Sequence, residues 1–169
     1  FHQHSSLFAF AVLIEKLAGI DGDDPTPLRL DKLEVLRERT GVDRPDAVRV
    51  LARHLSIEVP GYSLEYTPQA IKERTIGLIT EILLRASSDK PLVVAIEDLH
   101  WADPSTIEVV TRLCLALGTA PVLLLLTTRP TARVDDVRNA ATHIRLEPLA
   151  VDDMRALIAG LAGSTPLPE

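Results

Sequence analysis

The sequence predicts an α/β protein in which a parallel sheet flanked by helices follows a mainly helical part. Two short apolar runs, residues 91–97 and 121–128, have the uninterrupted hydrophobic character of strands inside a parallel sheet. The stretch between them has helical spacing, so strand, helix and strand form a βαβ unit with a right-handed crossover. Residues 1–88 are instead dominated by helical periodicity.

Four helices are expected before the first strand. They are predicted to begin at Ser5 or Ser6 and to cover residues 28–39, 45–55 and 67–87. The last of these has the clearest start, because Thr67 can cap the helix and Pro68 suits a first turn, where a missing N–H costs nothing.

The second half contains the strands. Asp103 and Pro104 are expected to open the helix between them, which runs to Leu117, and Ser105 with Glu108 offers an alternative capping box. A third strand is predicted over residues 143–149 and a last helix over 151–163. We expect residues 1–169 to form one partial domain, mainly helical over 1–88 and βαβ over 89–169.

Composition narrows the function classes. The net charge of −6 argues against a dominant nucleic-acid surface, which needs a basic patch. The single cysteine, Cys114, rules out an internal disulfide and fits a reducing compartment. No apolar run is long enough to span a membrane, and the start of the chain lacks a signal-peptide pattern. We therefore expect a cytoplasmic protein with neither nucleic acid nor membrane as a direct partner.

Polar side chains follow both predicted strands. Glu97 and Asp98 come after the first strand, and Thr127, Thr128 and Arg129 end or follow the second. Ligands of parallel sheets gather at the carboxyl ends of the strands, and these ends share one edge if the strands are neighbours. Two carboxylates, a guanidinium and hydroxyl groups suit a magnesium-bound polyphosphate. The spacing leaves open an alternative, in which Asp98 caps a turn and Arg129 pairs with it as a structural salt bridge.

Two longer strings resemble a known family. "PLVVAIEDLHWADPST" (91–106) and "PVLLLLTTRP" (121–130) are similar to the Walker B and sensor segments of STAND ATPases, which belong to the AAA-like P-loop class. The nearest likeness is to the ATPase module between a class III adenylate or guanylate cyclase domain and a helical-repeat tail in bacterial regulators. It extends to "FHQHSSLFAF", "TPQAIKERT" and "GLAGSTPLPE", and so covers essentially the whole chain. The resemblance implies a truncated P-loop NTPase-like sheet with a helical insert before the Walker B strand.

The resemblance also implies roles for individual residues. Glu97 and Asp98 match the Walker B pair and would hold Mg²⁺, with Asp98 polarising the attacking water. Arg129 matches the arginine that senses the terminal phosphate of ATP, and Thr127 or Thr128 would assist it. The order Glu–Asp is the reverse of the common one, so the division of labour between the two acids stays open.

One part of a nucleotide site is missing from the sequence. A phosphate cradle needs a glycine-rich loop that ends in Gly-Lys-Ser/Thr, and none of Lys16, Lys32, Lys72 and Lys90 lies in such a loop. By the resemblance, the cradle and a central strand precede Phe1, and a further nucleotide-contacting motif follows Glu169. We therefore expect weak or no ATP binding by this chain alone. We also expect its last strand to rearrange, or the chain to self-associate through exposed strand edges.

The sequence thus predicts part of an ATP-binding regulatory switch in a multidomain signalling protein. The parent would act on a cyclase or other output domain and a helical-repeat tail, whereas this segment alone would be inactive. Two alternatives remain: a non-enzymatic interaction module with a degenerate nucleotide site, and the regulatory domain of a transcriptional activator. An intact glycine-rich loop upstream would favour the switch, and a degenerate one the interaction module.

Overall fold

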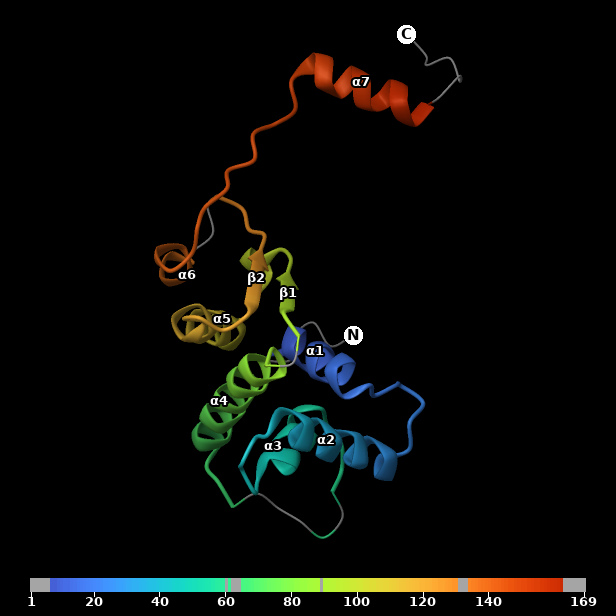
Figure 1. The fold of residues 1–169 in the computed structure, drawn as a ribbon, viewed down its shortest axis with the longest axis vertical. Coiled ribbons are helices and arrows are strands. Elements are labelled where there is room, and N and C mark those ends of the chain that lie inside the picture. Colours follow the sequence, from blue (N-terminus) through green and yellow to red (C-terminus); the bar gives the residue numbers. More distant parts are fainter. Residues whose placement is uncertain (1–6, 60, 62–64, 89, 131–133, 163–169) are drawn as a thin grey trace.

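The computed structural model describes residues 7–59, 61, 65–88, 90–130 and 134–162. It is an α/β structure in which four helices precede a small parallel sheet and three helices follow or connect its strands (Figure 1). The helices are α1 (Phe8–Ala18), α2 (Thr26–Thr40), α3 (Ala47–His54), α4 (Pro68–Ala86), α5 (Pro104–Ala116), α6 (Asp135–Asn139) and α7 (Val151–Ala162). The strands are β1 (Leu92–Ile96) and β2 (Val122–Leu126), and a 3₁₀ turn covers Leu99–Trp101. Among the described helices, none combines the length and apolar character that crossing a bilayer requires.

Helices α1 to α4 bury their apolar faces together. Helix α2 packs on α1, α3 and α4, and α4 also packs on α5, so the helical part is continuous with the sheet part. The buried side chains at the centre of the core include Phe10, Ile14, Leu33, Leu36, Leu51, Ile76, Ile79 and Leu83. The predicted start of α4 is confirmed: the Thr67 hydroxyl accepts a hydrogen bond from the Ala70 N–H at 3.2 Å, and Pro68 fills the first turn.

The βαβ unit is also confirmed. β1 and β2 are parallel neighbours, paired from Leu92 with Val122 to Ile96 with Leu126, and α5 connects them. Every second side chain of the strands turns toward the core, where Val94 is buried with Val109 and Leu113 of α5. This face of the sheet holds the strands against the helices.

The opposite face of the sheet is bare. Val93 lies opposite Leu123 and Ala95 opposite Leu125, and the exposed fractions of the three larger side chains are 61%, 60% and 54%. The apolar pattern, which is typical of strands covered on both faces, is matched by burial on one face, and the other face is open, as expected for a sheet that lacks its central strand. Among the described residues the sheet has two strands, so each is an edge strand.

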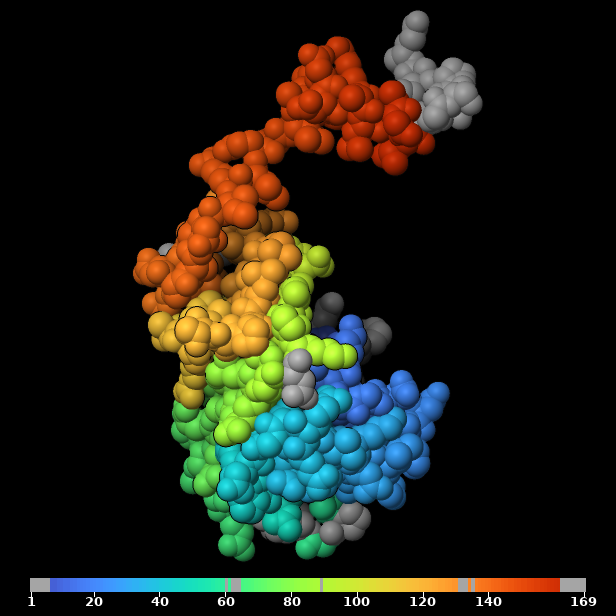
Figure 2. Space-filling model, in the orientation of Figure 1, coloured from blue at the N-terminus to red at the C-terminus, as the bar shows by residue number. Residues whose placement is uncertain are grey.

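The predicted third strand is wrong. Residues 143–149 are extended but form no ladder, and Ile144 and Leu146 are 83% and 88% exposed. A strand needs a neighbour's backbone groups, and here the chain passes through α6, an unpredicted helix that packs against α5. The next helix, α7, is confirmed close to its expected bounds. It stands clear of the other helices at the end of the extended segment (Figure 2).

The first helix starts later than expected. Leu7 has the left-handed backbone angle φ of 65°, and α1 begins at Phe8, whereas Ser5 and Ser6 lie outside the described residues. The Leu7 N–H donates to Asp103 Oδ2 at 3.1 Å, across 96 positions of sequence. A side chain at the start of α5 therefore holds the start of α1.

Asp103 also accepts hydrogen bonds from the first turn of α5. Its Oδ1 accepts from the N–H groups of Ser105 (2.9 Å) and Thr106 (3.2 Å), and its Oδ2 also accepts from the Thr106 hydroxyl at 2.5 Å. Burial alone would raise the pKa of the Asp103 carboxyl, but these bonds together hold that pKa below its ordinary value. Asp103 is thus the N-cap of α5, as predicted. Glu108 of the alternative box instead pairs with Lys72 and Arg112.

Replacing Asp103 is expected to loosen both helices. Asp103→Ala removes the N-cap of α5 and leaves the Leu7 N–H without its acceptor. This change should lower the free energy of unfolding by about 1–3 kcal/mol. Asp103→Asn, which keeps an oxygen acceptor, should cost less. Urea unfolding followed by far-UV circular dichroism measures both.

The loss of stability caused by replacing Asp103 should also depend on pH. Because the pKa of Asp103 is lowered in the folded state, its charge stabilises the fold above the ordinary pKa of 3.8. That stabilisation disappears as the pH falls through the lower, folded-state pKa. The stability gap between the unaltered protein and Asp103→Asn should therefore narrow below about pH 4. A gap that is constant from pH 6 to about pH 3 would contradict this assignment.

Candidate functional site

The carboxyl ends of β1 and β2 meet at one edge of the sheet. Beyond the last paired residues, the Thr127 N–H donates to the Ile96 carbonyl at 3.1 Å, and the Leu99 N–H donates to the Thr127 carbonyl at 2.8 Å. Glu97 and Asp98 therefore lie beside Thr127, as the predicted βαβ unit requires. The structure brings the acidic pair and the hydroxyl together from segments 30 positions apart.

Asp98 occupies a tight turn between β1 and the 3₁₀ turn. Its backbone is left-handed, with φ 53° and ψ 43°, a conformation that aspartate tolerates better than most residues. Its N–H donates to Thr127 Oγ1 at 3.0 Å, which fixes the turn to the neighbouring strand. The carboxylate is left pointing outward, and the side chain is 73% exposed.

His100 is the basic side chain recorded nearest to this carboxylate. Its Nδ1 lies 3.8 Å from Asp98 Oδ1, beyond hydrogen-bonding distance. The His100 side chain is only 10% exposed, and neither ring nitrogen has a hydrogen-bond partner among the described residues. Its ring packs against that of Trp101, with centroids 5.1 Å apart, and Trp101 is itself 76% exposed. A buried ring and an exposed one thus flank the acidic turn.

Thr128 and Arg129 follow β2 on the surface. Both are exposed, and the Arg129 carbonyl accepts a hydrogen bond from Arg138 Nη2 at 3.4 Å. In the described part of the chain, the Arg129 guanidinium makes no ion pair with Glu97 or Asp98. The structural salt bridge that the sequence left open between Asp98 and Arg129 is therefore not formed. Both charges remain accessible at the sheet edge.

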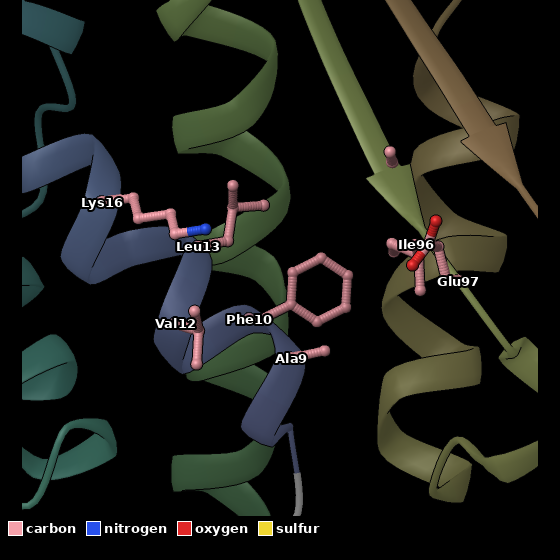
Figure 3. A pocket seen from close by; sticks show the side chains of 8 residues that line it. Ala9, Phe10, Val12, Leu13, Lys16, Ile96 and Glu97 are labelled. Carbon is pink, nitrogen blue, oxygen red and sulfur yellow. The ribbon is translucent and has the colours of Figure 1, made fainter. Parts of the chain in front are cut away.

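Lys16 is a residue near the site that the sequence analysis missed. It lines a hollow of about 220 Å³ together with Glu97, between α1 and the end of β1 (Figure 3). The apolar wall of the hollow includes Phe10, Leu13 and Ile96. No local pattern could have linked Lys16 to Glu97, because the contact between Leu7 and Asp103 brings α1 to the sheet.

Two of the other lysines are already engaged. Lys32 Nζ lies 2.6 Å from Asp24, and Lys72 Nζ lies 3.0 Å from Glu108. These lysines form ion pairs within the helical part and between α4 and α5. They are therefore not placed to contact a ligand at the sheet edge.

The arrangement fits the metal side of a magnesium nucleotide better than a self-sufficient metal site. Among the described residues, no group of three or more His, Cys, Asp or Glu side chains could hold a metal ion. Magnesium, however, is commonly bound by one or two carboxylates, with water and substrate phosphates completing its shell. Glu97 and Asp98 can supply those carboxylates. Arg129 lies on the adjacent strand end, where a terminal phosphate would bring charge.

Comparison with known proteins adds one relative. No protein-family model matches the chain, and no solved structure matches it. An uncharacterized protein of Rhizobium meliloti (strain 1021) is 31% identical over 125 residues, which is 73% of this chain and 12% of that protein. The chain thus matches about an eighth of the length of this relative. The resemblance to STAND ATPases stays a prediction.

The Thr127 hydroxyl should be the more important of the two threonines for stability. Thr127→Val removes the acceptor of the Asp98 N–H while keeping the shape, and should lower the free energy of unfolding by about 1 kcal/mol. Thr128→Val is the matched control, because Thr128 is likewise exposed, whereas the hydroxyl that bonds to the Asp98 N–H is that of Thr127. Urea midpoints compare the two variants. Equal midpoints would show that this hydrogen bond does not hold the turn.

Proposed function

We propose that the chain forms the metal and terminal-phosphate side of an ATP-binding switch domain within a longer signalling protein. The observation that carries the proposal is the hydrogen bond between the Asp98 N–H and Thr127 Oγ1. It fixes the acidic pair beside the strand end from which Thr128 and Arg129 continue. Carboxylates, a hydroxyl and a guanidinium at one sheet edge are the groups that a magnesium polyphosphate requires.

Glu97 and Asp98 would hold the magnesium ion through their carboxylates. Both side chains are exposed, and neither has a Lys or Arg partner among the described residues, so their charge remains for a cation. When bound, the ion neutralises phosphate charge and orients its waters. Asp98, whose turn is pinned by Thr127, is the better placed of the two to orient an attacking water. Arg129 would stabilise charge on the terminal phosphate, assisted by the Thr128 hydroxyl.

Arg129 is connected to α6 through hydrogen bonds of its backbone, so a phosphate contact at Arg129 can affect α6. Arg138 of α6 donates to the carbonyl groups of Arg129 (3.4 Å) and Pro130 (2.6 Å). A change in the backbone at Arg129 would therefore reach α6 directly, and α6 leads into the extended segment and α7. The loss of the terminal phosphate could in this way change how neighbouring domains are held.

The proposal needs parts outside these 169 residues. The phosphate cradle would come from a glycine-rich loop elsewhere in the protein, because none of the lysines here lies in one. The output domain, a cyclase or another regulator, would likewise lie outside. The much greater length of the Rhizobium meliloti relative is consistent with such additional domains.

Titration with a fluorescent ATP analogue and Mg²⁺ tests this function. The 169-residue chain should bind weakly or not at all, whereas a chain lengthened at its N-terminus through a glycine-rich loop should bind. In the lengthened chain, Asp98→Asn or Arg129→Ala should weaken binding roughly 10- to 100-fold, the loss expected for one charge-assisted contact.

Glu147→Gln and Arg145→Ala are matched controls. These two side chains are exposed and pair with each other at 2.7 Å in the extended segment. Both controls should bind the analogue with unchanged affinity. The proposal would be contradicted if neither chain binds the analogue, or if the Asp98 and Arg129 variants bind it with unchanged affinity. Either result would favour an interaction module.

A further inference from the structure

His100 is a buried histidine whose ring has no hydrogen-bond partner in the described part of the chain. Its side chain is 10% exposed, and both ring nitrogens, Nδ1 and Nε2, are shielded from solvent and unpaired. A buried polar group without a partner is destabilising, and native structures contain few of them. The ring therefore needs a partner, and that partner has to be a nearby group that can move.

Asp98 carries the carboxylate that can become this partner. The distance from His100 Nδ1 to Asp98 Oδ1 is 3.8 Å, which is about 1 Å longer than a hydrogen bond to a carboxylate. Because the chain itself covers both ring nitrogens, a group from outside cannot reach them unless the turn opens. Asp98 is part of that turn and already lies beside the ring.

Only the side chain of Asp98 has to move to close this gap. Its backbone is fixed, since it has a left-handed φ of 53° and its N–H donates to Thr127 Oγ1 at 3.0 Å. The His100 ring is fixed as well, by its burial and by packing against Trp101. The Asp98 side chain is 73% exposed, so it can rotate without disturbing the core. After this rotation Oδ1 accepts from the ring, and Oδ2 is free for another contact.

We propose that His100 is a positioning residue for Asp98. In the loaded site its neutral ring donates from Nδ1 to Asp98 Oδ1, and this bond directs Oδ2 toward the magnesium ion of the nucleotide. The inference rests on the proposed function, because it gives a partner to a carboxylate that would hold this ion. Carboxylates that bind metals are themselves hydrogen-bonded, and the loss of such a partner typically weakens metal binding about 10- to 100-fold.

NMR of the histidine ring nitrogens tests the hydrogen bond directly. The sample is the protein lengthened through a glycine-rich loop, and His100→Phe identifies the His100 signals. With saturating Mg²⁺ and a non-hydrolysable ATP analogue, His100 should carry its proton on Nδ1. The Nδ1–H proton signal should move downfield when this ligand is added, and Asp98→Ala should abolish the shift. A proton on Nε2, or an unchanged ring signal while the ligand binds, would overturn the proposal.

Binding of a fluorescent ATP analogue with Mg²⁺ provides the second arm. His100→Phe keeps a ring of similar size but removes both nitrogens, and it should weaken binding about 10-fold. His100→Asn, whose amide can donate close to the position of Nδ1, should bind more tightly than His100→Phe. His54→Phe is the matched control, because His54 on α3 also has a buried, unpaired Nε2 but lies in the helical part. Its affinity should be unchanged.

The same titration separates this role from the proposed function. If Asp98→Asn weakens binding and His100→Phe does not, the proposed function stands and the positioning role is overturned. If the lengthened protein does not bind, or Asp98→Asn has no effect, the proposed function fails and the positioning role fails with it. Equal losses of affinity for His100→Phe and His100→Asn, with lowered urea midpoints for both, would show that His100 acts only through packing.

Discussion

The hydrogen bonds that Asp103 accepts tie the start of the helical part to the sheet, in addition to the packing of α4 on α5. One carboxylate caps α5, the helix that connects the two strands, and also holds the N–H of Leu7 at the start of α1. Because α1 packs on α2, this contact ties the helical part to the sheet at a defined place. In that arrangement Lys16 of α1 and Glu97 at the end of β1 line one hollow. Asp103, which lies near the sheet edge, therefore has a structural role, whereas the neighbouring Glu97 and Asp98 are exposed.

The three acids of this region differ in what their surroundings leave free. Asp103 accepts hydrogen bonds from Leu7, Ser105 and Thr106, and these hold its pKa low. Glu97 and Asp98 are exposed, and Asp98 keeps its carboxylate outward because its backbone, rather than its side chain, bonds to Thr127. A carboxylate on a fixed turn without a cationic partner is suited to binding a metal ion. A carboxylate that already accepts several hydrogen bonds is suited to capping a helix. This contrast supports our assignment of separate roles within the string from 97 to 103.

Features encoded by neighbouring residues could be predicted from the sequence. Local patterns predict the helix caps at Thr67 and Asp103 and the two apolar strands. The connection rules of a βαβ unit predict that these strands are parallel. The third strand over 143–149 could not be settled, because a strand forms only where a neighbouring edge is available. Open apolar edges and faces of the sheet were expected from the resemblance, which places a central strand before Phe1, but an apolar run by itself does not reveal which face helices will cover. The place of Lys16 depends on the contact between Leu7 and Asp103, which no spacing encodes.

The central claim is that Glu97 and Asp98 hold the metal of a nucleotide at the strand ends. The most direct measurement is paramagnetic broadening of backbone amide signals by Mn²⁺ in the presence of ATP, in the protein lengthened through a glycine-rich loop. Our account predicts that the signals of residues 97–99 and 127–129 broaden first, and that Asp98→Asn reduces the effect. Broadening centred elsewhere, for instance on the acidic loop at residues 21–24, would contradict it.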